Sequence, residues 1–80
     1  MPKLKILSGE DLVKVFESFG FVVESQKGTH VKLKRISGDN SKQILVVPLH
    51  KELDKGTTKA IFNQSLKYIS AEELSKHFYG

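Results

Sequence analysis

The segment from Ser25 to Ile36 constrains the fold most, because a turn signal is followed at once by a strictly alternating strand. Successive side chains of a β-strand point to opposite faces of the sheet. Apolar and basic or titratable residues alternate here, with Val31 and Leu33 on one face and His30, Lys32 and Lys34 on the other. The pattern predicts a half-buried strand whose exposed face suits a polyanion, and RNA is our working interpretation.

A hairpin is predicted to connect this strand to the β-prone segment Phe21–Ser25. We expect a three-residue loop, Gln26–Gly28, in which Gly28 takes the left-handed conformation. In that register Glu24 lies opposite His30, where its carboxylate orients the imidazole ring and favours its charged form. A two-residue loop would bring Glu24 into the core, so three residues are preferred.

The remaining elements follow from helix and strand signals along the chain. A helix over about residues 9–19 is predicted from the N-cap Ser8 and from apolar residues at helical spacing. A third strand, Gln43–Val47, stops at Pro48, and a second helix opens with Thr57 as its expected cap. A short third helix, from the cap Ser70 to about Phe78, completes the chain. This order predicts a two-layer α+β domain with its helices on one face of an antiparallel sheet.

Composition narrows the possible functions of the chain. Its 80 residues suffice for one small domain with a shallow surface site. No apolar run approaches the length of a membrane span, and the N-terminal apolar stretch is too short for a signal peptide. There is no cysteine, so a thiolate nucleophile and a disulfide framework are excluded and the cytoplasm is the expected compartment. The net charge of +4 permits nucleic-acid binding without requiring it.

His30 is the principal catalytic candidate. It could act as the general base that activates an RNA 2′-hydroxyl or as the acid that protonates the leaving 5′-oxygen, with Lys32 and Lys34 stabilising the charge of the phosphorane. The alternative is an ordinary surface histidine. His50 is either a second catalytic group or a residue that fixes its loop. The histidines are too dispersed to predict a metal site.

The helix start at residues 55–59 is the second candidate site. Free N–H groups and the positive end of the helix dipole suit a phosphate oxygen, although an ordinary capped helix start explains the same residues. The candidate RNA contacts of the whole chain are Lys27, Lys32, Lys34, Lys55, Thr57 and Lys59.

Several short motifs together resemble the HicA toxins of bacterial and archaeal toxin–antitoxin pairs. They are, in order, Gly20-Phe21, Gln26-Lys27-Gly28-Thr29-His30, Val47-Pro48-Leu49-His50, Lys55-Gly56-Thr57 and Gln64. The resemblance runs from about Ser8 to Ile69. It implies a double-stranded-RNA-binding-domain-like fold and a ribosome-independent mRNA interferase whose active site is covered by a HicB antitoxin. It also implies that His30 is the catalytic residue and that Gly28 is needed for its turn.

The chain departs from the family pattern at several positions. Ser25 stands where many members carry arginine, and Thr58 replaces a usual leucine. The stretch Gln64-Ser65-Leu66 departs from the usual Gln-Ala-Gly-Leu. These departures bear on substrate preference and rate more than on the fold.

We therefore expect a single HicA-like domain over residues 1–80, with a core of about 8–69 and a helical extension of 70–80. The expected activity is endoribonucleolytic cleavage of mRNA without a metal or other cofactor, and the expected partners are RNA and a HicB-like antitoxin rather than a membrane. The alternatives are a non-catalytic RNA-binding module that uses the same face and a protein-interaction domain that binds an acidic partner.

Overall fold

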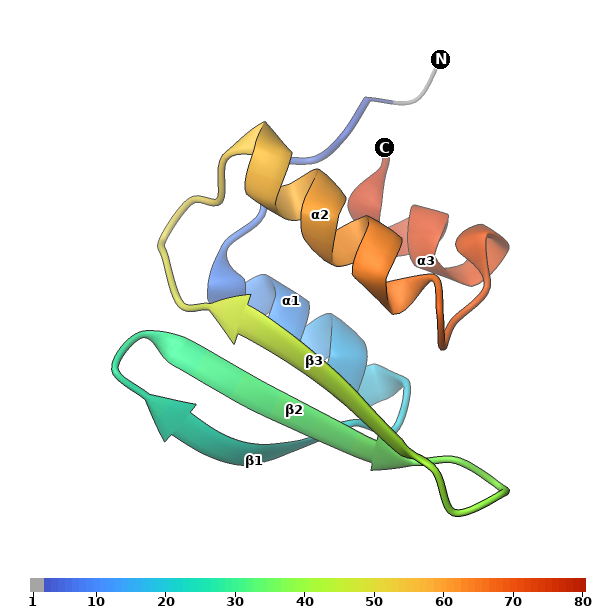
Figure 1. Cartoon of the computed structure of the whole chain (residues 1–80). Helices are drawn as coiled ribbons and strands as arrows, with labels where there is room; N and C mark the ends of the chain where they lie inside the picture. The colour runs from blue at the N-terminus through green and yellow to red at the C-terminus, as the bar shows by residue number, and fades with distance from the viewer. Residues whose placement is uncertain (1–2) are drawn as a thin grey trace.

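The structure, a computed structural model, describes residues 3–80 and contains three helices and three strands within that range (Figure 1). In chain order they are α1 (Gly9–Ser18), β1 (Val22–Lys27), β2 (His30–Ile36), β3 (Lys42–Pro48), α2 (Lys55–Ser65) and α3 (Ala71–Phe78). The strands form an antiparallel sheet in the order β1-β2-β3. This confirms the predicted α+β, double-stranded-RNA-binding-domain-like fold with an additional C-terminal helix.

The first helix begins and ends as its sequence signals predict. The Ser8 hydroxyl accepts a hydrogen bond from the Asp11 backbone N–H at 3.0 Å, and the Asp11 carboxylate accepts one from the Ser8 N–H at 3.0 Å. These reciprocal bonds satisfy donors that a helix N-terminus leaves unpaired. At the other end Gly20 takes a φ of +93°, a conformation that favours glycine. Between the two ends, Leu12 and Phe16 are fully buried.

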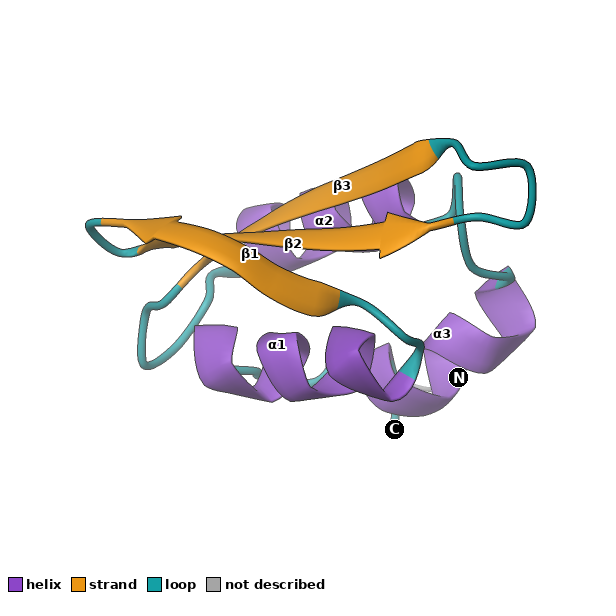
Figure 2. Cartoon of the chain, turned by 90° about the horizontal axis from the view of Figure 1, so that it is seen from below, coloured by secondary structure: helices purple, strands orange, loops and turns teal. Residues whose placement is uncertain are grey.

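A single hydrophobic core lies between the sheet and the helices. α1 and α3 lie on one side of the sheet, α2 runs along β3, and no helix covers the other side in the part of the chain described (Figure 2). Val31 and Leu33 are buried, as the alternation predicts, and Phe16 and Phe78 pack with ring centroids 6.3 Å apart.

The C-terminal extension is part of this core, because Leu74 and Phe78 of α3 have no exposed surface.

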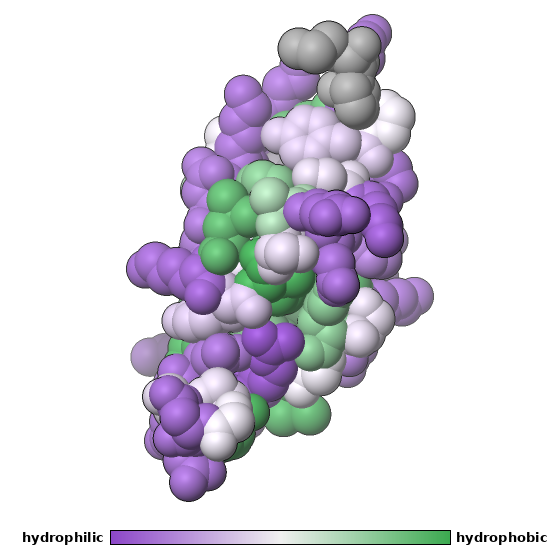
Figure 3. Space-filling view, turned by 90° about the vertical axis from the view of Figure 1, so that its right-hand side faces the viewer, coloured by the Kyte–Doolittle hydropathy of each residue, from purple (hydrophilic) through white to green (hydrophobic). Residues whose placement is uncertain are grey.

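The side of the molecule that faces right in Figure 1 carries hydrophobic side chains along its middle, bordered by hydrophilic ones (Figure 3). An isolated antiparallel bridge between Leu4 and Tyr79 joins the two ends of the chain. The Lys3 N–H donates to the Gly80 carbonyl at 3.1 Å, and the Gly80 N–H donates to the Lys3 carbonyl at 2.9 Å.

The predicted hairpin register is wrong in its loop length. Lys27 pairs with His30, so the loop contains only Gly28 and Thr29. Gly28 has a φ of +61°, as predicted, and glycine at the first loop position is the pattern of a type II′ turn. A bulge between Val23 and Ser25 absorbs one extra residue, Glu24. The shorter loop and the bulge shift the faces in opposite directions, so Val23 still shares a face with Leu33.

The cap of α2 also differs from the prediction. Asp54, not Thr57, is the N-cap. Its carboxylate accepts hydrogen bonds from the Thr57 N–H at 3.1 Å and from the Thr57 hydroxyl at 2.6 Å. By contrast Ser70 caps α3 as predicted, accepting from the Glu73 N–H at 3.3 Å. Within residues 3–80, no helix has both the length and the apolar character needed to cross a membrane.

Candidate nucleic-acid interface

The uncovered face of the sheet includes three rows of side chains that each run across all three strands. Residues opposite one another in a sheet share a face and have Cβ atoms about 4.5–5.5 Å apart. The rows, each given in the order β1, β2, β3, are Lys27–His30–Pro48, Ser25–Lys32–Val46 and Val22–Lys34–Ile44. The structure therefore brings three of the predicted RNA contacts and His30 onto one open surface.

His30 lies at the end of this face, as the first residue of β2. It is exposed, and its cross-strand neighbours are Lys27 on one side and Pro48 on the other. The turn before it is held by two hydrogen bonds. Leu49 N–H donates to the Thr29 carbonyl at 2.6 Å, and the Gln26 amide donates to the Gly28 carbonyl at 3.1 Å. The imidazole is therefore presented to solvent from a fixed backbone.

The cation next to His30 is Lys27, and Glu24 does not take the place predicted for it. Glu24 sits in the bulge, where its carboxylate lies 3.9 Å from the Lys34 ammonium group. Lys34 is thus partly neutralised, while Lys27 and Lys32 make no ion pair within residues 3–80. A two-residue loop, Gly28–Thr29, would have predicted that Lys27 lies opposite His30. That loop keeps Val23 on the buried face only if β1 also contains a bulge.

The Arg35 side chain does not lie on the open face of the sheet. Its guanidinium donates to the Gln43 side chain at 2.7 Å, the Phe19 carbonyl at 2.8 Å and the Tyr68 carbonyl at 2.9 Å. It also lies over the Phe21 ring, 4.7 Å from the centroid. The alternation of β2 places Arg35 on the same side as the buried residues, so its role is to connect the sheet to the helical layer.

The start of α2 lies apart from the open face. Lys55 and Lys59 line a groove of about 560 Å³ together with Lys3 and Tyr79, next to the paired ends of the chain. Thr57 uses both its N–H and its hydroxyl for Asp54, and these bonds hold the pKa of the Asp54 carboxyl below its ordinary value. This helix end therefore already carries an anion of its own.

The other two histidines differ in their surroundings. The His50 carbonyl accepts from the Gly9 N–H at 2.9 Å, so the backbone of His50 fixes its loop against α1, while its side chain is exposed. The His77 ring packs edge-on against Phe19, with centroids 5.5 Å apart. Among residues 3–80, no group of three His, Cys, Asp or Glu side chains is placed to hold a metal ion.

Comparison with known families shows which family the chain belongs to. Residues 9–66 match the family model described as "HicA toxin of bacterial toxin-antitoxin". No curated protein and no solved structure matches the chain. The matched region contains α1, the whole sheet and α2, and it covers well over half of the 80 residues. The protein therefore belongs to the HicA family, the toxins of bacterial toxin–antitoxin pairs.

Proposed function

We propose that this toxin is an endoribonuclease that cleaves mRNA in the cytoplasm by proton transfer through His30. The observation that supports it best is the row Lys27–His30 at the end of the open face, with Lys32 next to it. An exposed imidazole between lysine side chains offers a proton carrier and positive charge where a phosphodiester can approach from solvent.

The proposed reaction is an internal transesterification of RNA. The 2′-hydroxyl loses its proton and attacks the adjacent phosphorus, and the bond from phosphorus to the 5′-oxygen breaks. The products are a 2′,3′-cyclic phosphate and a 5′-hydroxyl, which takes up a proton. His30 acts either as the base at the 2′-hydroxyl or as the acid at the 5′-oxygen, and each role accelerates such reactions by roughly 10²–10⁴-fold. The exposed side chain of His50, at the same end of the sheet, is the candidate for the second proton transfer.

The lysines supply the charge stabilisation in this scheme, and none of its steps uses a metal ion. Lys27 and Lys32 flank His30 and have no carboxylate partner within residues 3–80, so we assign them to the scissile phosphate. Lys34, paired with Glu24, is assigned to a neighbouring phosphate. Lys55 and Lys59 would contact RNA that flanks the cut. We leave Thr57 out of the RNA contacts because Asp54 occupies its donors.

The same face also suits a protein inhibitor. Three large hydrophobic side chains on it are strongly exposed, with Val22 at 58%, Ile36 at 50% and Val46 at 40% of their full accessible surface. The strand register interleaves these side chains with Lys32 and Lys34, so the face offers a protein partner both apolar contact and positive charge. We propose that a HicB-type antitoxin covers these residues and thereby keeps RNA away from His30.

Analysis of the cleavage products tests the proposed chemistry. Partner-free protein is incubated with an end-labelled single-stranded RNA and with the same strand carrying 2′-deoxyribose at the cleavage site. The proposal predicts 2′,3′-cyclic phosphate ends and no cut at the deoxy position. Ends bearing 5′-phosphate, or cleavage of the deoxy strand, would refute it. Salt-sensitive binding without any cleavage would instead support the RNA-binding module.

A further inference from the structure

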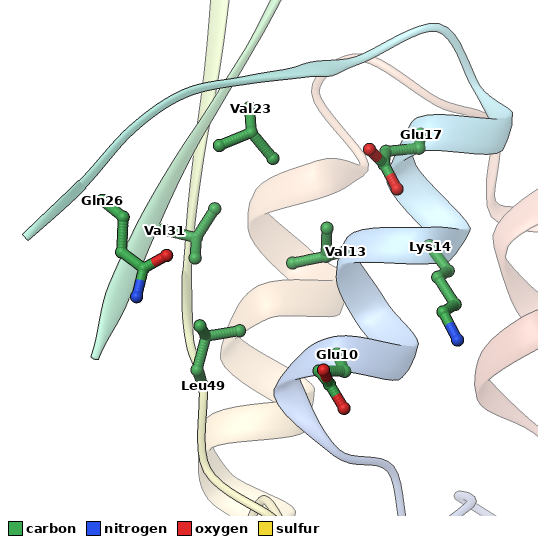
Figure 4. A pocket seen from close by; sticks show the side chains of 8 residues that line it. All are labelled: Glu10, Val13, Lys14, Glu17, Val23, Gln26, Val31 and Leu49. Carbon is green, nitrogen blue, oxygen red and sulfur yellow. The ribbon is translucent and has the colours of Figure 1, made fainter. Parts of the chain in front are cut away.

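A second surface feature lies between α1 and β1, on the helical side of the sheet. It is a groove of about 230 Å³ with an apolar lining of Val13, Val23, Val31 and Leu49 (Figure 4). Val23 faces the helical side of the sheet, as does Leu33 opposite it. Leu33 is buried, but 46% of the accessible surface of Val23 is exposed. The groove can therefore receive an apolar side chain from outside the molecule.

The rim of this groove carries more negative than positive charge, in contrast to the whole chain. Glu10, Lys14 and Glu17 of α1 line it, so two carboxylates outnumber one ammonium group, and the Lys14 side chain extends away from the strands (Figure 4). Carboxylates at this position repel the phosphates of RNA and attract basic side chains. The charge favours a protein segment over RNA as the occupant.

The strand that borders the groove is at the edge of the sheet. Within residues 3–80, β1 pairs only with β2, and no backbone group from a turn or loop pairs with its outer side. An edge strand of this kind can accept an added strand from a partner, with alternate side chains of the partner entering neighbouring pockets. The bulge at Glu24 interrupts the edge, so only a short partner strand fits.

We propose that an extended segment of the antitoxin, with alternating apolar and basic side chains, docks beside β1. Its backbone pairs with the free edge, an apolar side chain enters the groove, and a basic side chain contacts Glu10 or Glu17. This inference rests on the proposed pairing with an antitoxin, but it concerns a contact separate from the open face. A symmetric dimer is a poorer occupant, because the acidic rim would then meet its own copy.

The location of the groove gives this contact a consequence for inhibition. Gln26 and Val31 line the groove and are the chain neighbours of Lys27 and His30, whose side chains point to the opposite face. A segment held beside β1 would therefore anchor the antitoxin next to the proposed catalytic row while leaving the open face for its main body.

Antitoxin affinity and amide exchange together test the proposal on the full-length chain with its HicB-family antitoxin. Glu17→Lys and Val23→Glu should each weaken binding by about tenfold or more, as central interface substitutions do. Glu72→Lys on α3 and Leu66→Glu after α2 are matched exposed controls and should leave affinity unchanged. Hydrogen exchange of the β1 amides should slow in the complex. All four free variants should cleave RNA as the unsubstituted chain does.

Unchanged affinity in both groove variants, or β1 amides that exchange equally fast in the free chain and the complex, would overturn the inference. Loss of RNA cleavage in the groove variants would assign the groove to RNA, and β1 protection by self-association would assign it to a second copy. RNA cleavage reports separately on the proposed function. If the unsubstituted chain does not cleave RNA but the groove variants lose affinity as predicted, the docking site is supported and the ribonuclease proposal is refuted. If the unsubstituted chain cleaves RNA but the groove variants keep their affinity, only the ribonuclease proposal is supported.

Discussion

Substitution of Gly9 by alanine should destabilise the fold far more than its place at the start of a helix suggests, because Gly9 is buried. Gly9 is the first residue of α1 and packs against the segment that follows β3. A Cβ atom there would lie 2.1 Å from the Pro48 carbonyl oxygen and 2.6 Å from the Leu49 Cα. Both are backbone atoms, so no side-chain rotation relieves the overlap. The helix and the segment must move apart by roughly 1 Å to restore normal contacts.

The cost of this movement can be estimated from two terms. Separation of the elements strains or breaks the 2.9 Å hydrogen bond from the Gly9 N–H to the His50 carbonyl, worth about 1 kcal/mol. Overpacking at a rigid contact costs about 1–3 kcal/mol. The better helix propensity of alanine returns at most about 1 kcal/mol. The expected loss is therefore about 1–3 kcal/mol, a large part of the roughly 5–15 kcal/mol of a small domain.

Urea unfolding of Gly9→Ala and Gly56→Ala measures this loss against a matched control. Gly56 also lies in the first turn of a helix, but a Cβ there meets only the Asp54 side chain, at 3.2 Å. Gly56→Ala should therefore change stability by less than about 0.5 kcal/mol. If Gly9→Ala is as stable as Gly56→Ala, the close approach of α1 to the Pro48–His50 segment is wrong. Because Leu49 also holds Thr29, Gly9→Ala should reduce RNA cleavage as well.

Three further substitutions and one control, Lys34→Ala, test the packing and the electrostatics. Arg35→Ala leaves the Phe19 and Tyr68 carbonyls without their donor and should lower the free energy of unfolding by about 3 kcal/mol; Lys34→Ala, which breaks only a surface ion pair, should cost under about 1 kcal/mol, and equal effects in urea unfolding would contradict the assignment of Arg35 to the core. Phe78→Ala should cost about 3–5 kcal/mol, since the ring is fully buried; a small change in its melting temperature would mean that α3 is not part of the core. Hydrogen bonds from Ser37 and Ser41 lower the pKa of Asp39 from 3.8 to about 2. The stabilising contribution of this carboxylate is thus present above pH 3.8 and lost as the pH falls through 2, so the stability difference between the unsubstituted chain and Asp39→Asn should shrink over that range. A difference that stays constant down to pH 2 would refute the role of these hydrogen bonds.

Local signals in the sequence were sufficient to predict the element order and the open face. Ser8 is followed three positions later by Asp11, which completes the helix cap. Gly20 and Gly28 mark left-handed positions, and β2 alternates from His30 to Lys34. Each of these features depends only on neighbouring residues and on the period of the helix or strand. Neighbouring residues and period are the same whatever the rest of the fold is.

The errors arose where the sequence alone leaves two solutions of similar merit. A three-residue loop and a two-residue loop with a bulge bury the same side chains, so the alternation could not distinguish them, and Lys27 rather than Glu24 lies opposite His30. Asp54 and Thr57 are both good N-caps, and the path of the preceding loop decides between them. The contacts of Arg35 join residues 16 and 33 positions away, which no local pattern reveals.

RNA cleavage by the unsubstituted chain, His30→Ala and His50→Ala, each with and without EDTA, tests the central proposal most directly. All three proteins should unfold at similar temperatures, because both imidazoles are exposed. We expect cleavage that persists in EDTA and falls by roughly 10²–10⁴-fold in His30→Ala, with a smaller loss in His50→Ala. Equal activity of His30→Ala and the unsubstituted chain, or activity abolished by EDTA, would contradict a metal-free reaction centred on His30.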